Sequence, residues 1–359
     1  MTEKPVVKVC HLVSGDLWAG AAVAAHHLLL GLRACAGVEV SAVVLNPGIL
    51  AQRLEHTGLL AALEPEHGRS FVALARAVLG VVEKADLVHA HGYKEDMLAA
   101  LSGRPWVATQ HGRPEPHHGA ARVRAALYDG LDRIIQRRRA RRVVAVSREV
   151  ERWVAGRIGA ARVVHAWNGI VDPLADCTIV PWQSRPRRVG VLARLHPVKG
   201  IDLAIRAIAA LPDVELEIVG DGPERASLVA LSRALGAGDR VHFTGFDPDP
   251  GARLARWRLL LVPSLHEGNP IGVLEALAFG TPVLAGPLPG VAEILGGRGG
   301  RQLPDRVPAR WAAAIRNAVD DYAFGCEASA AGRARFREAF TASAAADRML
   351  GVYRAALAA

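Results

Sequence analysis

The sequence is poor in cysteine and lysine and has no long hydrophobic run. Its four cysteines stand far apart, without the paired spacing of a zinc site or a disulfide framework, which is typical of reduced thiols. No apolar run approaches the roughly 18 residues of a transmembrane helix, and the first residues lack the pattern of a signal peptide. We therefore expect a cytoplasmic protein, with a peripheral position at the inner face of a membrane as the alternative.

The 359 residues carry a net charge of +9, and only five of the 44 basic residues are lysine, which leaves 39 arginines. A positive surplus favours anionic partners, but a chain rich in arginine, alanine and glycine also fits a biased genome, so charge alone excludes no function. A hydrophobic content of 51% and a charged content of 22% are typical of a folded globular chain. The length predicts two domains, each large enough for its own core.

Short apolar strands alternate with helical patterns along the chain, which is typical of doubly wound α/β folds. Prolines and polar residues interrupt the alternation once, and we place an interdomain linker there, at residues 173–187. The linker separates a first domain, residues 1–172, from a second domain, residues 188–342. A final helix, residues 343–359, follows the second domain. The expected strands are Val6–Val13, Glu39–Leu45, Leu87–His91, Trp106–Thr109, Val143–Val146, Val163–Ala166, Arg188–Ala193, Glu215–Val219, Val241–Thr244, Leu259–Val262 and Val283–Ala285.

The clearest local pattern covers residues 259–285, which predict a strand, a loop, a helix and a second strand. The uninterrupted apolar run Leu259–Val262 is typical of a buried parallel strand. Asn269 and Pro270 predict the N-cap and the first position of the helix, and Gly280 predicts its end. The loop before the helix therefore lies at the carboxyl end of a parallel strand, where ligands bind in open α/β sheets.

Two glutamates flank the start of this helix: Glu267 falls on the loop and Glu275 inside the helix. Free backbone N–H groups of Ile271, Gly272 and Val273 would face the same crevice, which suits an anionic ligand. The two carboxylates are then placed for hydroxyl groups. The spacing alone fits an amphipathic helix equally well, but the surrounding Glu-Gly-x-Pro, Leu-Glu-Ala and Gly-Thr-Pro-Val sequences favour the binding interpretation.

These residues resemble the Glu-x7-Glu signature of retaining glycosyltransferases with the GT-B fold, and most closely that of the GT4 family. The resemblance implies an α/β protein with two Rossmann-like, doubly wound domains that face a central cleft, and a C-terminal helix that crosses back to the first domain. It also implies that Glu267 lies beside the donor sugar and that Glu275 binds the ribose of the nucleotide.

Residues 193–200 read Ala-Arg-Leu-His-Pro-Val-Lys-Gly and match the family's Gly-Arg-Leu-x-x-x-Lys-Gly, except that Ala193 replaces the first glycine. The resemblance places Arg194 at a strand end and Lys199 just before a helix. A guanidinium and an ammonium there suit the two phosphoryl groups of a diphosphate and the charge that develops on the departing nucleotide. The alternative is two ordinary surface cations beside a turn.

Two further segments of the second domain resemble the family. Residues 220–223, Gly-Asp-Gly-Pro, suit a tight strand-to-helix turn, which we interpret as mainly structural. Residues 241–246, Val-His-Phe-Thr-Gly-Phe, resemble the strand and loop that receive the base. A pocket edged by Gly245 and Phe246 and a buried strand without a ligand are equally good interpretations of this segment.

In the first domain, a loop from Gly15 to Gly20 connects the first expected strand to a helix, Gly20–Arg33. The loop fits neither the dinucleotide fingerprint nor a P-loop. It resembles the glycine-rich loop that approaches the donor phosphates in the family, although Ala19 stands where most members have a glycine. The resemblance makes Gly20 a donor-binding candidate, and Trp18 either lines the acceptor site or packs beside the loop.

Histidines follow two expected strands of the first domain. Thr-Gln-His-Gly at residues 109–112 resembles the family's Thr-x-His-Gly/Asp, which implies that His111 lies beside the donor sugar. A hydrogen-bonded loop histidine is the alternative. His89 and His91 share one face of a strand, which raises the question of a metal. Because no third ligand is near in sequence, we favour packing or a strand-end hydrogen bond and predict no metal site.

The segment from Arg137 to Arg142 contains five arginines, and Ile134 and Ile135 precede it. A basic helical segment can bind the headgroups of anionic phospholipids, which makes a peripheral membrane contact one interpretation. A solvated helix end in an arginine-rich protein is the other. Because no aromatic belt accompanies the charges, we do not expect nucleic-acid binding.

The resemblance therefore implies a retaining glycosyltransferase that moves a sugar from a nucleoside diphosphate sugar to a glycan, lipid-linked or small-molecule acceptor, in cell-envelope polysaccharide or glycoconjugate biosynthesis. This interpretation requires no cofactor or metal, because two cationic side chains neutralise the diphosphate. The alternatives are a nucleotide-sugar epimerase or sugar phosphorylase of the same fold, and a noncatalytic nucleotide-sugar-binding module. The predicted catalytic residues are His111, Glu267, Arg194 and Lys199, and the predicted donor-binding residues are Gly20, Arg194, Lys199, Gly245, Asn269, Ile271, Gly272, Val273 and Glu275.

Overall fold

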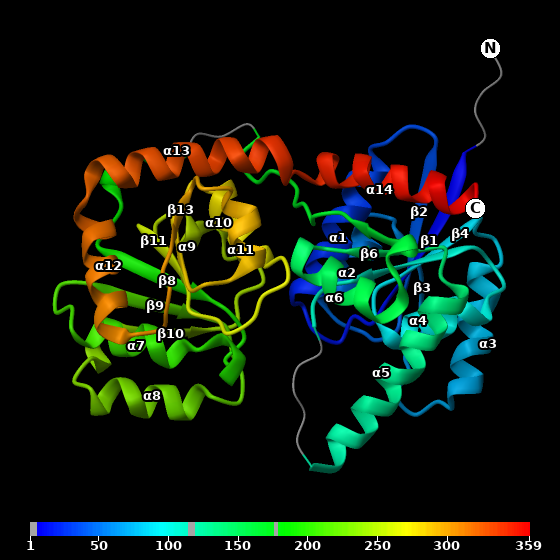
Figure 1. Cartoon of the computed structure of the whole chain (residues 1–359), viewed down its shortest axis with the longest axis horizontal. Coiled ribbons are helices and arrows are strands. Elements are labelled where there is room, and N and C mark those ends of the chain that lie inside the picture. The colour runs from blue at the N-terminus through cyan, green and yellow to red at the C-terminus, as the bar shows by residue number, and fades with distance from the viewer. Residues whose placement is uncertain (1–5, 114–118, 176–178) are drawn as a thin grey trace. The chain divides into compact units, whose positions relative to one another are not determined.

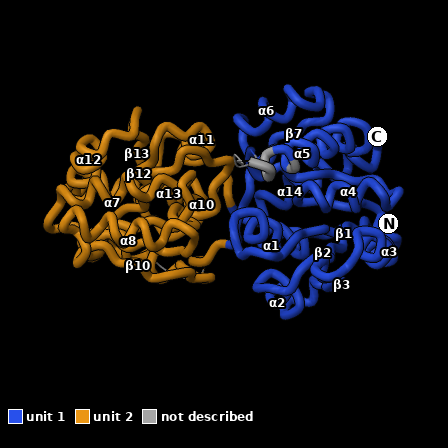
Figure 2. Tube along the Cα trace, turned by 90° about the horizontal axis from the view of Figure 1, so that it is seen from below, with its two compact units in different colours: residues 1–171, 341–359 blue, residues 172–340 orange. Residues whose placement is uncertain are grey.

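The computed structural model describes residues 6–113, 119–175 and 179–359, with only the backbone for residues 119–122 and 124. The chain divides into two compact units (Figure 2): Met1–Val171 with Thr341–Ala359, and Asp172–Phe340. Each unit is built on one parallel sheet with helices (Figure 1), as the alternation of strands and helices in the sequence predicts.

The first unit contains strands β1 (Val7–Val13), β2 (Val38–Val44), β3 (Leu60–Leu63), β4 (Leu87–Ala90), β5 (Trp106–Gln110), β6 (Arg142–Ala145) and β7 (Val163–His165), and helices α1 (Gly20–Arg33), α2 (Ile49–His56), α3 (Phe71–Val82), α4 (Tyr93–Leu101), α5 (Gly119–Arg139), α6 (Arg148–Ile158) and α14 (Ala342–Leu357). The strand order is β3-β2-β1-β4-β5-β6-β7. Alternate strand residues pack into two apolar layers, one with α1, α2 and α14, the other with α3, α4 and α6.

The last helix, α14, packs along α1 within the first unit. The two helices approach closely at Gly31, where a Cβ atom would lie 2.3 Å from the carbonyl oxygen of Ala342. Apolar residues of α14 complete one core layer, and its Tyr353 reaches the interior, where 2% of the residue is exposed. The end of the chain is therefore part of the core of the first unit.

The second unit contains strands β8 (Arg188–Leu192), β9 (Glu215–Val219), β10 (Val241–Gly245), β11 (Leu259–Val262), β12 (Val283–Ala285) and β13 (Gly300–Gln302), and helices α7 (Ile201–Ala209), α8 (Arg225–Ala234), α9 (Gly251–Leu254), α10 (Ile271–Ala278), α11 (Pro289–Leu295), α12 (Pro308–Asp320) and α13 (Tyr322–Ala339). The strand order is β10-β9-β8-β11-β12-β13, and all neighbours are parallel. The loops that follow β8, β9 and β11 therefore meet at one edge of the sheet.

Two strands, β3 and β13, were not predicted. β3 reads Leu-Ala-Ala-Leu and β13 reads Gly-Arg-Gln, so neither has the β-branched or aromatic residues that mark a strand in a sequence. Each lies at the edge of its sheet. An edge strand has a partner on one side alone, so it needs less of a buried pattern than a central strand.

The segment predicted as an interdomain linker, residues 173–187, belongs to the second unit. The indole Nε1–H of buried Trp182 donates to the carbonyl oxygen of Arg258 at 2.9 Å. The buried guanidinium of Arg185 donates to the carbonyl oxygen of Trp257 at 2.9 Å. Prolines interrupt the helix and strand patterns of this segment, but Trp182 and Arg185 still pack in the interior of the second unit. Residues 176–178 of the predicted linker lie outside the described part of the chain.

Candidate active site

Lys199 and Glu267, which are 68 residues apart in the sequence, form an ion pair in the second unit. The Lys199 Nζ atom lies 2.8 Å from Glu267 Oε1, and the side chains are 22% and 12% exposed. The Ser264 hydroxyl donates to the same carboxylate oxygen at 2.7 Å. An ammonium has three N–H donors, so Lys199 can hold Glu267 and also donate to an anionic ligand.

The two loops that carry this pair are tied together by their backbones. The N–H of Leu265, after β11, donates to the carbonyl oxygen of Val198, after β8, at 2.8 Å. Gly200 has a φ of 58°, and a Cβ atom there would lie 2.4 Å from the carbonyl oxygen of Pro263. Only glycine adopts this conformation and this close approach without strain. The geometry of the ion pair is thus set by the backbone.

Helix α10 begins at Ile271 with Pro270 as its N-cap, one residue later than predicted. The carbonyl of Pro270, rather than that of buried Asn269, accepts the first helical bond, from the N–H of Val273 at 3.1 Å. The N–H of Val273 is therefore already used, contrary to the prediction. The N–H groups of Ile271 and Gly272 precede any helical acceptor, and proline offers no capping side chain, so the positive end of α10 can receive an anion.

Glu275 lies one turn further along α10 and is half-buried. Burial raises the pKa of Glu275 to about 7, and the nearby Asp249 carboxylate acts in the same direction. The carboxyl group is consequently poised between its neutral and ionised forms at neutral pH. A group in this state can accept hydrogen bonds from a hydroxyl pair, such as a ribose diol, once it loses its proton.

Arg194 follows β8 on the same loop as Lys199, and its side chain is exposed. The backbone beside it is held by the glycine turn after β9. A Cβ atom at Gly220 would lie 1.9 Å from the carbonyl oxygen of Ala193, and one at Gly222 would lie 2.4 Å from that of Leu195. The glycines at 220 and 222 thus let two strand-end loops pack backbone to backbone, which agrees with the structural role predicted for this turn.

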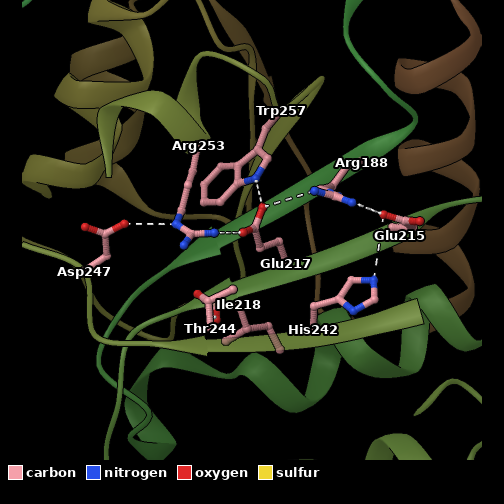
Figure 3. Close-up of polar contacts among 9 residues, drawn as sticks. All are labelled: Arg188, Glu215, Glu217, Ile218, His242, Thr244, Asp247, Arg253 and Trp257. Carbon is pink, nitrogen blue, oxygen red and sulfur yellow. Dashed lines mark hydrogen bonds and ion pairs between the residues drawn. The ribbon is translucent and has the colours of Figure 1, made fainter. Parts of the chain in front are cut away.

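A charge network centred on buried Glu217 lies next to the loop after β10 (Figure 3). Glu217 on β9 is 5% exposed and accepts from Trp257 Nε1 at 2.8 Å and from the guanidinium of Arg253. Arg253 Nε also donates to Asp247 at 2.9 Å. Since Asp247 lies two residues after Gly245, the network fixes the loop that was predicted to receive the base.

The outer side of the same loop is open. Gly245 has a φ of 80°, and a Cβ atom there would meet nothing within 4 Å. Phe246 is 52% exposed. β10 is an edge strand with partly exposed residues, which contradicts the interpretation of this segment as a buried strand. The network partners Glu217, Arg253 and Trp257 were missed, although Glu215 and Glu217 alternate with apolar residues and so share one face of β9.

The first unit gathers four histidines at the carboxyl ends of three adjacent strands. His11 ends up beside His91 because β1 pairs with β4. His91 Nδ1 lies 3.2 Å from His111 Nε2, and the His11 and His91 nitrogens are 3.0 Å apart. His89 is also in the cluster, and its ring stacks on that of His91. The sequence showed no third histidine near His89 and His91. In the structure that third histidine is His11, which lies on β1, far from the other two along the chain.

Burial keeps these histidines neutral. It lowers the pKa of His111 to about 4 and that of His11 to about 3. Burial also holds the pKa values of His89 and His91 well below the usual range, and the neighbouring rings add to the effect. One pocket reaches the cluster, and its lining comprises Ala24, Leu28, His91, Thr109, His111, Val144, Val146, Ala166, Trp167, Asn168, Gly169, Ala345 and Met349.

The loop after β1 leads, as predicted, into a helix that begins at Gly20. Gly20 opens α1 and is exposed, and a Cβ atom there would meet nothing within 4 Å. The position that requires glycine is Gly15, with a φ of 85°, where a Cβ atom would lie 2.4 Å from Val44. Trp18 packs beside the loop, with the guanidinium of Arg53 4.4 Å from its ring centroid. Gly20 and His111 belong to the first unit, whereas the other predicted site residues belong to the second.

The predicted basic segment is divided between two elements. Helix α5 ends at Arg139, with Arg137, Arg138 and Arg139 exposed, and β6 begins at Arg142. α5 also has an exposed apolar face that the sequence interpretation did not include. Its members are Val123, Leu127, Tyr128, Leu131 and Ile134. In the described part of the chain, no helix combines the length and the apolar character that crossing a membrane requires.

Solved structures with the same architecture define the fold. HepE of Anabaena, in complex with UDP-glucose, matches with a TM-score of 0.84 and 20% identity, over 97% of this chain and 99% of that chain. Sucrose-phosphate synthase of Thermosynechococcus elongatus matches with a TM-score of 0.75 and 20% identity, over 97% and 98% of the two chains. The fold is therefore GT-B, as the sequence predicted.

Sequence comparisons give the family. Residues 18–173 match "Glycosyltransferase Family 4" and residues 178–337 match "Glycosyl transferases group 1". D-inositol 3-phosphate glycosyltransferase 1 of Catenulispora acidiphila is 30% identical over 312 residues, which are 76% of this chain and 72% of that protein. The 2-deoxystreptamine glucosyltransferase of Streptomyces kanamyceticus is 30% identical over 59% of this chain, and the match spans 62% of that protein. The chain belongs to the GT4 family of glycosyltransferases.

Proposed function

We propose that the protein transfers a sugar from a nucleoside diphosphate sugar to an acceptor hydroxyl, with retention of configuration. One arrangement carries the proposal: the Lys199–Glu267 ion pair lies on the loops after β8 and β11, and the sequence leads from there directly into the open start of α10. A cation and a helix N-terminus suit a diphosphate. The carboxyl groups of Glu267 and Glu275 suit the hydroxyls of a sugar and a ribose.

The proposed chemistry is electrostatic. As the bond between the anomeric carbon and the diphosphate breaks, Arg194, Lys199 and the first N–H groups of α10 stabilise the charge on the leaving group. The acceptor oxygen forms its bond to the same face of that carbon, and its proton passes to the leaving phosphate oxygen. This scheme needs neither a protein nucleophile nor a metal, and His111 contributes a neutral partner for a sugar hydroxyl. A trapped covalent glycosyl-enzyme would contradict it.

We place the acceptor among polyhydroxylated small molecules or cell-envelope glycans. The names of the relatives support both classes: one is a 2-deoxystreptamine glucosyltransferase, several are D-inositol 3-phosphate glycosyltransferases, and another is an O-antigen biosynthesis glycosyltransferase. We further propose a peripheral contact with anionic membrane through α5, because its exposed apolar face ends in three exposed arginines. An envelope acceptor would bring the enzyme to that surface.

The first test is a thermal-shift screen against UDP, GDP, ADP and dTDP and their common sugar conjugates, followed by turnover with each donor that binds. A ligand at 100 times its Kd adds about 2.7 kcal/mol to the free energy of unfolding. We expect one nucleotide class to raise the melting temperature. In Lys199→Ala the shift should vanish and kcat should fall about 10²-fold or more, as when one group that stabilises developing charge is removed.

The matched control is Lys84→Ala, which removes an exposed lysine of the first unit. It should leave both binding and turnover unchanged. Lys199→Ala should lower the free energy of unfolding by about 1–3 kcal/mol, because the largely buried Glu267 carboxylate loses its ion-pair partner and keeps the Ser264 hydroxyl. Turnover of a sugar nucleotide without any acceptor would favour an epimerase instead. Binding without turnover across a broad acceptor panel would favour a noncatalytic module.

A further inference from the structure

A continuous chain of hydrogen bonds runs through the core of the first unit. It begins at Thr109, whose Oγ1 lies 2.7 Å from His89 Nε2. The other ring nitrogen of His89, Nδ1, lies 2.8 Å from the hydroxyl of Tyr353 on α14. The same hydroxyl lies 3.1 Å from His11 Nε2. The tyrosine therefore joins two histidines that come from different strands.

The chain continues from His11 to the candidate site residue. His11 Nδ1 lies 3.0 Å from His91 Nε2, and His91 Nδ1 lies 3.2 Å from His111 Nε2. His11, His89 and His91 each use both ring nitrogens in the chain, and all three are buried. We name the six residues the histidine relay: Thr109, His89, Tyr353, His11, His91 and His111.

The number of protons constrains the relay. Each neutral imidazole carries one N–H, and the tyrosine and threonine carry one O–H each, which makes six protons for five hydrogen bonds. A gap with two protons is repulsive, and a gap with none leaves two acceptors facing each other. Each gap therefore holds one proton, and the sixth proton points out of the chain at one of its two ends.

Only two arrangements satisfy this condition. In one, Thr109 donates into the chain, each histidine carries its proton on Nδ1, and His111 presents Nδ1–H outward. In the other, each histidine carries its proton on Nε2, Thr109 directs its hydroxyl proton outward, and His111 presents a lone pair on Nδ1. We propose that the histidine relay sets the tautomer of His111 cooperatively, so that the four rings share one tautomer and His111 is either a donor or an acceptor toward a ligand.

Both ends of the relay lie at the same pocket, since Thr109, His91 and His111 line it. Conversion between the two arrangements moves one proton across each gap. The net result is one proton gained at one end of the relay and one lost at the other, with no charged residue left in the core. His11, His89, His91, Tyr353 and Thr109 are positioning residues in this scheme. The use of His111 on a sugar hydroxyl rests on the proposed function, whereas the shared tautomer does not.

A metal ion is the alternative occupant of this cluster, because His11, His89 and His91 offer nitrogens within 4.8 Å of one another. The ring geometry favours the relay. His89 and His91 stack with centroids 4.2 Å apart and 27° between their planes. Imidazole lone pairs lie in the ring plane, so stacked rings direct them side by side rather than toward one ion. Each of these rings already has polar partners at both nitrogens.

The test is nitrogen NMR of the full chain labelled with ¹⁵N-histidine, which separates Nδ1–H, Nε2–H, doubly protonated and metal-bound rings. We expect His11, His89, His91 and His111 to be neutral at pH 7 and to share one tautomer. Tyr353→Phe removes the hydroxyl that joins the two halves, so the tautomer populations of His111 should change although two rings intervene. Thr109→Ser keeps the end hydroxyl and should preserve the shared tautomer.

The matched control is Tyr322→Phe, which removes an exposed hydroxyl in the second unit and should change nothing. Different tautomers among the four wild-type rings, a charged ring at pH 7, stoichiometric zinc, or unchanged His111 populations in Tyr353→Phe would each overturn the relay. Should Tyr353→Phe not fold, Thr109→Val interrupts the relay from its end. In turnover, Tyr353→Phe should lower kcat and leave the donor KM unchanged. If the wild-type protein turns over no donor, the proposed function is wrong. The histidine tautomers measured by NMR would still show whether the relay exists.

Discussion

Two polar clusters, one in each unit, lie in opposite environments. In the second unit, Lys199 and Glu267 form an ion pair and remain partly exposed on the loops after β8 and β11. In the first unit, His11 and His91 are buried and neutral. Burial of a charge without a partner costs several kcal/mol, whereas a neutral ring costs little once both of its nitrogens are bonded. In these two clusters, the charged groups lie near solvent, where an anion can reach them, and the neutral groups set hydrogen-bond direction in the core.

Glu217 tests this comparison, because it is a buried carboxylate in the same unit as the partly exposed Lys199–Glu267 site. We expect Glu217→Leu to lower the free energy of unfolding by about 1–3 kcal/mol, since the indole N–H of Trp257 loses its acceptor. The loop after β10 should loosen as well, because Arg253 then holds Asp247 alone. Urea denaturation measures the first effect and nucleotide titration the second.

The control is Glu215→Leu, on the same strand and the same face. Glu215 pairs with Arg188, but both side chains are more than a third exposed, so its loss should cost about 1 kcal/mol or less. If the two substitutions destabilised the protein equally, burial would not be what distinguishes the two carboxylates. The contrast between charged and neutral polar networks would then have no energetic basis here.

The same contrast explains what could be predicted from the sequence. The candidate site of the second unit consists of residues in short motifs. Arg194, Lys199, Glu267 and Glu275 could each be predicted as site residues from their immediate neighbours in the sequence. Even there, Pro270 displaced the helix start by one residue, because the N-cap depends on which carbonyl accepts the first bond. Local pattern predicts local geometry to within about one residue and no better.

The histidine relay of the first unit could not be predicted in this way. His11 and Tyr353 are 342 residues apart, and the packing of α14 on α1 brings them together. The pairing of β1 with β4 brings His11 beside His89. A histidine in a strand and a tyrosine in the last helix are ordinary residues when each is considered with its own neighbours. The sequence motif around His111 indicated a functional residue, but the partners that orient it are tertiary neighbours.

The pH dependence of donor binding should come from the charged unit. With a pKa of about 7, Glu275 is mostly protonated at pH 6 and mostly ionised at pH 8. If ribose hydroxyls donate to the carboxylate, a sugar nucleotide should bind about tenfold more tightly at pH 8 than at pH 6. The neutral His111, with a pKa of about 4, does not titrate in this range. Calorimetric titration at pH 6, 7 and 8 measures the change.

Glu275→Gln is the matched variant, since it keeps the size of the side chain and removes the titration. Its donor affinity should be weaker at pH 8 and independent of pH. If the donor affinity of Glu275→Gln changed with pH as the wild-type affinity does, the titrating group would be another residue. Free nucleoside diphosphates should be avoided in this measurement, because their terminal phosphate titrates in the same range, whereas the diphosphate of a sugar nucleotide does not.

The smallest expected effect concerns the surface of the first unit. Arg138→Gln should weaken binding to vesicles of phosphatidylglycerol and phosphatidylcholine about fivefold, because one basic residue near an anionic surface contributes about 1 kcal/mol. Arg76→Gln removes another exposed arginine, from α3, and should change nothing. Vesicles of phosphatidylcholine alone test whether the apolar face around Leu127 binds without charge. Equal losses in the two arginine variants would assign the attraction to the net charge of the protein rather than to α5.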